Sequence, residues 1–367
     1  MADQHTLSKV HSLSDVELAC LLSLLSNEHC IISTPPSCLD DLVAELHLVC
    51  ARTFGLSAAV VECSPHTTLD EFASSLLLPP AYPPVSPTTP RSFSPALARS
   101  PHDSYFPRTA AAATNPTGTT GRPLHAQIAN VILAKNLNQA PKAVQIQALE
   151  LLRTHRIFTK TSVQTAPKTF MLVAVLGAES GGEARVTAHL NDFFYIAHWV
   201  DPDEEGFMHL PAAYSRNSTS AAFPFSPTSP FPFTAPAPLL PTSELTHLRQ
   251  LTAAVATDID VTRYQMNIVA FLRMHRAVGG GITPQATRHL DMLCRSLAPL
   301  HGIDYVTPAL VCLAARKVYL HRIAMVAPSR ERSLQWGSDL AAIERLLEGW
   351  APEDVVEDVL LLVGAPV

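Results

Sequence analysis

The chain has 367 residues, of which 47% are hydrophobic and 16% are charged, enough for one large folded domain or two smaller ones with an apolar core. The formal net charge is -6, and lysine and arginine form no cluster along the sequence. The sequence therefore offers no cluster of positive charge that would attract nucleic acid or an anionic membrane, and we expect neither as a partner.

Seven cysteines, an odd number without a CxxC pair, lie mostly in apolar contexts. They indicate buried free thiols in a reducing compartment, not a disulfide framework or a zinc site, so we expect no metal. The N-terminal sequence MADQHTLSKVHSL is unlike a signal peptide, and no apolar run reaches the roughly 18 residues that a spanning helix needs. A cytoplasmic or nuclear location is expected.

In the first part of the chain, apolar strands alternate with helices. Ser14 followed by Glu17 has the spacing of a capping box at the start of a helix. Helices are predicted over 14–26, 38–53, 68–78 and 141–155, and strands over 28–33, 57–63, 128–134, 169–176 and 192–200. Continuous apolar strands separated by helices favour a parallel sheet covered on both faces, in three layers. Residues 1–208 are therefore predicted to form an α/β domain.

Two segments, 79–120 and 209–242, hold more than half of the 31 prolines. Proline at that density blocks both helices and sheet ladders, so we predict a disordered insertion and a disordered linker. Six Ser-Pro or Thr-Pro pairs in them are candidate targets of proline-directed kinases, which would make the insertions regulatory: Ser86, Thr89, Ser94, Ser100, Ser226 and Ser229. The alternative is disordered filler in which serine and proline are simply common.

From residue 243 onward the pattern is helical throughout. Helices are predicted over 243–256, 260–277, 284–300, 307–324, 338–348 and 352–363. Pro284, Pro308 and Pro352 lie at or near helix starts, where the missing N–H is tolerated. Residues 243–367 are thus predicted to form a second, all-helical domain.

Three stretches carry a resemblance to a known family. They are VILAKNLNQAPKAVQIQALELLRTHRIFT (131–159), HLNDFFYIAHWVDPD (189–203) and GGITPQATRHLDMLCRSLAPLHGIDYVTPALVCLAARKVYLHRI (280–323). The chain resembles the MoxR and magnesium-chelatase branch of the AAA+ ATPases, including a group of fungal magnesium-chelatase-like proteins. The resemblance covers both folded parts and implies a phosphate-loop α/β core followed by a helical AAA lid domain.

The family's catalytic positions are degenerate in this chain. IISTPPSCLDDLV (31–43) has the outline of a phosphate-binding loop, but the resemblance places Asp40 in the lysine slot and Asp41 in the Ser/Thr slot. One carboxylate about 4 Å from a phosphate oxygen costs on the order of 4 kcal/mol at an effective dielectric of 20. Ser37 and Asp40 also have the spacing of a capping pair, so we expect the helix to cap itself there.

The other nucleotide-pocket slots have changed as well. By the resemblance, Lys135 and Asn136 replace the acidic pair that holds magnesium, while Asn138, Ala140 and Pro141 of the surrounding signature remain. The slots of the sensor-1 asparagine, the arginine finger and the sensor-2 arginine hold Gly177, Asp192 and Gln285, and Arg288 lies one helical turn after Gln285.

Five such losses beside a retained scaffold favour a pseudo-ATPase that binds no cofactor. We predict a protein-interaction scaffold, or the inactive partner of AAA+ subunits in a homo- or hetero-oligomer. The alternative is a magnesium-chelatase-type ATPase that uses ATP and Mg²⁺ with unorthodox pocket residues, among them Lys135 and Arg288.

Overall fold

The computed structural model describes residues 4–78, 127–159, 162–180, 183–204, 206–210 and 237–366. The predicted insertion over 79–120, most of the linker over 209–242, and the six Ser-Pro and Thr-Pro pairs lie outside the described residues. In the described part, no helix is long and apolar enough to span a membrane. All seven cysteines are free, and five of them are buried as predicted, while Cys38 and Cys312 are partly exposed.

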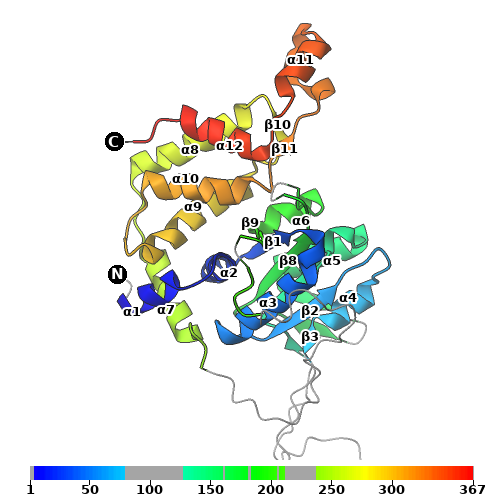
Figure 1. Ribbon diagram of the computed structural model, residues 1–367, viewed down its shortest axis with the longest axis vertical. Coiled ribbons are helices and arrows are strands. Elements are labelled where there is room, and N and C mark those ends of the chain that lie inside the picture. Colours follow the sequence, from blue (N-terminus) through cyan, green and yellow to red (C-terminus); the bar gives the residue numbers. More distant parts are fainter. Residues whose placement is uncertain are drawn as a thin grey trace, which may run out of the picture.

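A five-stranded parallel sheet forms the centre of the first part of the chain (Figure 1). The strand order is β2-β5-β8-β1-β9, and the strands are β1 (His29–Thr34), β2 (Ala58–Glu62), β5 (Val131–Lys135), β8 (Met171–Gly177) and β9 (Phe194–Trp199). The predicted parallel α/β sheet is confirmed. Its carboxyl edge gathers the loops that follow Thr34, Lys135 and Gly177.

Helices cover both faces of the sheet, because successive strand side chains point to opposite sides. Ile32 faces the core formed with α2 (Asp15–Ser26) and α3 (Leu39–Arg52), whereas Ile31 faces the core formed with α4 (Leu69–Ser75), α5 (Lys142–Thr154) and α6 (Ala188–Phe193). The capping box at the start of α2 is confirmed, since Ser14 accepts from the Glu17 N–H and the Glu17 carboxylate accepts from the Ser14 N–H.

Several short elements depart from the prediction. The helix predicted over 68–78 ends at Ser75 and is followed by β3 (Leu77–Leu78), which pairs with β4 (Gln127–Ile128). The strand predicted over 192–200 begins only at Phe194, because the residues before it form α6. An N-terminal helix, α1 (Gln4–His11), and a hairpin of β6 (Arg156–Phe158) and β7 (Val163–Thr165) complete this part.

The chain after the linker is mainly helical. Its helices are α7 (Thr242–Ala254), α8 (Ile259–Met274), α9 (Pro284–Leu300), α10 (Pro308–Tyr319), α11 (Leu340–Leu347) and α12 (Pro352–Leu362). The prediction of helix throughout was wrong in one place: β10 (Val278–Gly280) pairs with β11 (Ala324–Met325). Two short 3-10 helices, η3 (Pro328–Arg330) and η4 (Arg332–Trp336), lead to α11, which projects from the rest (Figure 1).

Helix α2 lies between the sheet and these C-terminal helices (Figure 1). It contacts β1 and β9 on one side and α7 and α9 on the other, and nine of its twelve residues are buried. A helix that is apolar all round is expected in such a central position. One apolar core therefore continues from the sheet into the helical part.

Candidate functional site

The loop after β1 is a tight turn built on two prolines. Residues Pro36–Cys38 form a 3-10 turn, η1, and α3 begins at Leu39 with Cys38 as its N-cap, without any side-chain cap. The predicted capping by Ser37 is therefore wrong; its hydroxyl lies 3.6 Å from the Cys38 sulfur instead. The prolines fix the backbone as a 3-10 turn, so the helix starts after Ser37.

This turn is poorly suited to cradle a phosphate. A phosphate-binding loop offers successive backbone N–H groups at a helix N-terminus, but Pro35 and Pro36 have no N–H, and the Cys38 N–H donates to the Pro35 carbonyl at 2.9 Å. Asp40 and Asp41 lie in the first turn of α3, where their charge favours the positive end of the helix dipole. Burial and the neighbouring Asp40 raise the pKa of Asp41.

Lys135 ends β5 and binds two carboxylates. Its Nζ lies 2.5 Å from Asp40 Oδ1 and 3.2 Å from Glu62 Oε1. Burial lowers the pKa of Lys135, but the hydrogen bonds and charges of Asp40 and Glu62 outweigh it, so the pKa is raised. Glu62 was not predicted as a site residue, although it ends the adjacent strand β2 and pairs in register with Lys135.

Asn136 and Gly177 complete the carboxyl edge. Asn136 has a left-handed backbone, with φ of 55°, and its N–H donates to the Val175 carbonyl at 2.9 Å. At Gly177, a Cβ atom would lie 3.3 Å from Pro36 Cα, so the turn after β1 packs directly against the end of β8. A sensor-1 asparagine at Gly177 would require the Pro36 backbone to shift by a few tenths of an ångström.

Asp192, at the predicted arginine-finger position, is used within the chain. Its Oδ1 accepts a hydrogen bond from the Thr283 hydroxyl at 2.6 Å and lies 3.6 Å from the Arg322 Nε. Thr283 is itself the N-cap of α9, where it accepts from the Ala286 N–H. Asp192 thus fixes the start of α9 against the sheet.

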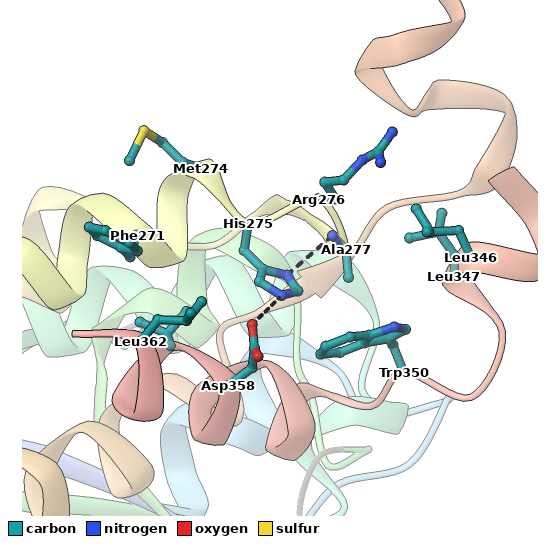
Figure 2. Close-up of a pocket in the computed structure, with 11 residues that line it drawn as sticks. Phe271, Met274, His275, Arg276, Ala277, Leu346, Leu347, Trp350, Asp358 and Leu362 are labelled. Atoms are coloured by element: carbon teal, nitrogen blue, oxygen red, sulfur yellow. Dashed lines mark hydrogen bonds and ion pairs between the residues drawn. The ribbon is translucent and has the colours of Figure 1, made fainter. Parts of the chain in front are cut away.

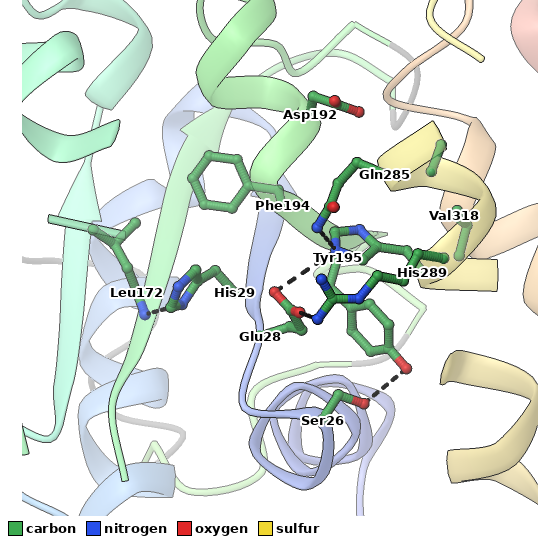
Figure 3. A network of polar contacts seen from close by, with 12 residues as sticks. Ser26, Glu28, His29, Leu172, Asp192, Phe194, Tyr195, Gln285, His289 and Val318 are labelled. Atoms are coloured by element: carbon green, nitrogen blue, oxygen red, sulfur yellow. Dashed lines mark hydrogen bonds and ion pairs between the residues drawn. The ribbon is translucent and has the colours of Figure 1, made fainter. Parts of the chain in front are cut away.

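Arg322 is the centre of a buried polar network at the amino edge of the sheet. The guanidinium donates to the carbonyls of Phe194, Tyr195 (3.3 Å) and Val318 (2.5 Å), and to His289 Nδ1 at 2.6 Å (Figure 3 shows His289 and its neighbours). Burial, then the positive charge of Arg322, lowers the pKa of His289 to about 2, so the imidazole stays neutral and accepts from Arg322.

Gln285 and Arg288 lie on α9 in the same network. The Gln285 side-chain amide is 2.7 Å from His289 Nε2 (Figure 3). Arg288 Nη2 is 3.8 Å from a carboxylate oxygen of Glu28. Burial raises the pKa of Glu28 to about 7, and the positive charges of Arg288 and Arg322 offset only part of this effect. The Tyr195 hydroxyl, bonded to Ser26 at 2.8 Å, extends this network to α2.

The nine predicted site residues therefore form two groups. Ser37, Asp40, Asp41, Lys135, Asn136 and Gly177 lie at the carboxyl edge of the sheet, whereas Asp192, Gln285 and Arg288 lie beside Glu28 and Phe194, at its amino edge. The six residues of β1 separate the edges by about 20 Å. A ligand at one edge cannot contact the other group of the same chain.

No protein-family model matches the chain. Two curated relatives are each called maintenance of telomere capping protein 2. The one from Lachancea thermotolerans is 32% identical over 108 residues, 28% of this chain, and the one from Kluyveromyces lactis is 26% identical over 92 residues, 24% of this chain. The matched segments span only 38% and 34% of the length of those relatives.

A crystal structure of a candidate ATPase from Cytophaga hutchinsonii aligns with 99% of this chain and 94% of its own, with a TM-score of 0.61 and 13% identity. An MCM homolog from Methanopyrus kandleri aligns with 86% of this chain and 57% of its own, at 11% identity and a TM-score of 0.44, too low to carry an argument. The first alignment, together with the parallel sheet, supports an AAA+ fold for this chain.

Proposed function

We propose that the chain is a non-hydrolysing AAA+-fold scaffold of the MoxR and magnesium-chelatase type, which acts through protein contacts and needs no cofactor. The observation that carries this proposal is the ion-pair cluster of Lys135, Asp40 and Glu62 at the carboxyl edge. Its two carboxylates outnumber the single ammonium. Asp41 adds a further acid beside them.

A triphosphate would meet unfavourable charge and too few donors there. Each carboxylate about 4 Å from a phosphate oxygen costs on the order of 4 kcal/mol at an effective dielectric of 20. Lys135 already binds two acids, so it would have to leave them to contact a phosphate. The two prolines remove backbone N–H groups that a phosphate loop provides.

On this proposal the helical part takes the place of an AAA lid domain, held in one position by the Arg322 network. The partners are proteins, either other AAA+ subunits in a homo- or hetero-oligomer or clients of a scaffold. The name of the two curated relatives makes telomere capping the first process in which to look for them, and we propose a nuclear or cytoplasmic location.

A phosphate-release assay on the full chain, alone and with the proteins that co-purify with it, tests the proposal. We expect no turnover beyond that of the partners. The alternative is a magnesium-chelatase-type ATPase that uses ATP and Mg²⁺. One observation favours it: the Arg288 side chain is 64% exposed, so it would be accessible to a nucleotide held by a neighbouring subunit. Turnover that disappears in Lys135→Ala or Arg288→Ala would establish the alternative and end our proposal.

A further inference from the structure

A pocket of about 400 Å³ lies where the end of α8 meets the antiparallel β10–β11 strand pair and η3. Four arginines line it: Arg273, Arg276, Arg330 and Arg332. Its lining includes no lysine and no acidic residue. In a chain with a net charge of -6, this concentration of guanidinium groups is unusual.

Two of these arginines donate to backbone carbonyls and keep other donors available. Arg332 Nη2 donates to the Met274 carbonyl at 2.7 Å, and Arg273 Nε donates to the Ile282 carbonyl at 3.1 Å. Each guanidinium carries five N–H donors. Within the described residues, no hydrogen bond or ion pair is found for the Arg330 side chain, which is exposed at the end of η3.

One carboxylate offsets part of the positive charge. Glu331, buried between η3 and η4, lies 3.4 Å from Arg276 Nε and caps η4 by accepting from the Ser333 N–H. Four guanidiniums beside one carboxylate leave an excess of about three positive charges. Such an excess favours a multiply charged anion.

An apolar groove of about 430 Å³ adjoins this pocket, and Arg276 lines both (Figure 2). The groove runs between α8, α11 and α12, and Figure 2 shows Phe271, Leu362 and Trp350 around it. Two further polar side chains of the groove contact each other, since His275 Nε2 lies 3.3 Å from Asp358 Oδ2. Phe271 and Leu362 are 40% and 60% exposed.

We propose that the arginine pocket and the adjoining groove form one docking site for a phosphorylated segment of a partner protein. The phosphoryl group would lie among Arg273, Arg276 and Arg330, and a large apolar residue a few positions away would lie in the groove. This inference rests on the proposed scaffold function, to which it adds a surface and a class of partner.

Charge and geometry favour a phosphoryl group over a carboxylate. A phosphorylated serine or threonine carries about -1.5 to -2 charges and three acceptor oxygens, whereas a carboxylate carries one charge and two oxygens. Planar guanidinium groups bind phosphate in a bidentate manner, which an ammonium cannot do. Arginine clusters are a recurrent means of recognising phosphorylated motifs. The apolar groove beside the pocket favours a protein segment over a nucleic acid backbone.

The test uses the full chain and a peptide library with a central phosphoserine or phosphothreonine flanked by five randomised residues on each side. Enriched peptides are resynthesised in phosphorylated, unphosphorylated and glutamate-substituted forms, and their affinities are measured by fluorescence polarisation. We expect enrichment of leucine or phenylalanine near the phosphorylated residue. We also expect the phosphorylated form to bind at least about tenfold tighter than either other form, a difference of about 1.4 kcal/mol.

Substitutions in the arginine pocket and the groove test whether the phosphopeptide binds at this site. Arg330→Ala and Arg273→Ala should each weaken the phosphopeptide at least about threefold, and Leu362→Ala should reduce the preference for an apolar residue while phosphate dependence remains. Arg263→Ala is the matched control, since Arg263 lies on α8 but pairs with Asp260 outside the pocket. Neither Arg330 nor Leu362 has a contact whose loss would unfold the chain, and circular dichroism checks each variant.

Three outcomes would overturn the inference: no enrichment of phosphorylated peptides, equal binding of the glutamate form, or equal affinity in Arg330→Ala and Arg263→Ala. Equal binding of a single-stranded oligonucleotide with the same arginine dependence would also overturn it, because a generic anion site would then explain the data. A nucleotide titration at the carboxyl edge is a separate measurement, so failure of the scaffold proposal is recognised independently.

Discussion

The two edges of the central sheet carry similar side chains in different surroundings. At the carboxyl edge, Lys135 pairs with Asp40 and Glu62, and the two acids are each 73% exposed. At the amino edge, Arg322 is 4% exposed and donates to several backbone carbonyls and to the buried His289. The first cluster lies at positions that the family resemblance assigns to a nucleotide pocket, and the second joins the helical part to the sheet.

This difference in burial determines what each cluster can contribute. Exposed ion pairs contribute about 0 to 1 kcal/mol to stability, whereas removing one partner of a buried ion pair costs about 3 to 5 kcal/mol. The amino edge should therefore dominate stability. The carboxyl edge should matter mainly by the ligands that it repels.

The largest effect is expected for Arg322→Ala. This change removes the guanidinium donor from the carbonyls of Tyr195 and Val318, and from that of Phe194, which keeps His321 as a partner. It should lower the free energy of unfolding by about 3 to 5 kcal/mol. Urea denaturation measures it. Arg295→Ala, which removes a surface pair with Asp291, is the control and should cost under about 0.5 kcal/mol. Similar values for the two variants would refute the difference between the edges.

Gly281→Ala should be the next most harmful change. Gly281 has φ of 99°, and a Cβ atom there would lie 1.8 Å from the Arg322 carbonyl oxygen. Because the backbone itself must move, we expect a loss of about 3 kcal/mol in the free energy of unfolding. Gly280→Ala is the matched control, since no atom lies within 4 Å of its added Cβ. Equal stability of the two variants would contradict the close packing.

Glu28→Gln tests the same edge by pH. Burial raises the Glu28 pKa from 4.5 to about 7 in the folded chain, which therefore binds the proton more tightly than the unfolded chain. Protonation of Glu28 thus contributes to the free energy of unfolding. This contribution is fully present below pH 4.5 and is lost as the pH rises through 7. The free energy of unfolding of Glu28→Gln, relative to that of the wild type, should therefore rise by about 2 kcal/mol when the pH is raised from about 5 to about 8. Denaturation at both pH values measures this gain, and a constant difference would contradict it.

The smallest effect is expected for Lys135→Ala at the carboxyl edge. Its partners Asp40 and Glu62 are exposed and water can solvate them, so the free energy of unfolding should fall by less than about 1 kcal/mol. Urea denaturation beside Arg322→Ala gives the comparison. A loss above about 2 kcal/mol would mean that the carboxyl edge is a structural centre as well.

Much of the fold could be predicted from residue patterns. The five strands of the sheet and the helices α2, α3, α5 and α9 could be predicted from the periodicity of apolar residues, because this pattern is contained within each segment of the chain. The β10–β11 strand pair could not be predicted, because its strands of three and two residues are too short to show a periodicity and α9 and α10 lie between them in the chain. Their pairing depends on Gly281 packing against Arg322. Ser37 was misassigned as a cap because two prolines override the capping signal.

The site was only partly accessible from sequence. Lys135 and Asp40 were identified from the motif positions that they occupy in the family resemblance. Their direct pairing and the contribution of Glu62 depend on strand register. The separation of Asp192, Gln285 and Arg288 from the other positions depends on how the helical part packs against α2 and β9. Glu28 and His289 carry no local motif, so only their burial together identifies them.

Isothermal titration of the full chain with a non-hydrolysable ATP analogue and Mg²⁺ is the most direct test that the carboxyl edge no longer accepts a triphosphate. We predict no measurable heat, which corresponds to a Kd weaker than about 1 mM. Micromolar binding that is lost in Lys135→Ala would contradict the proposal.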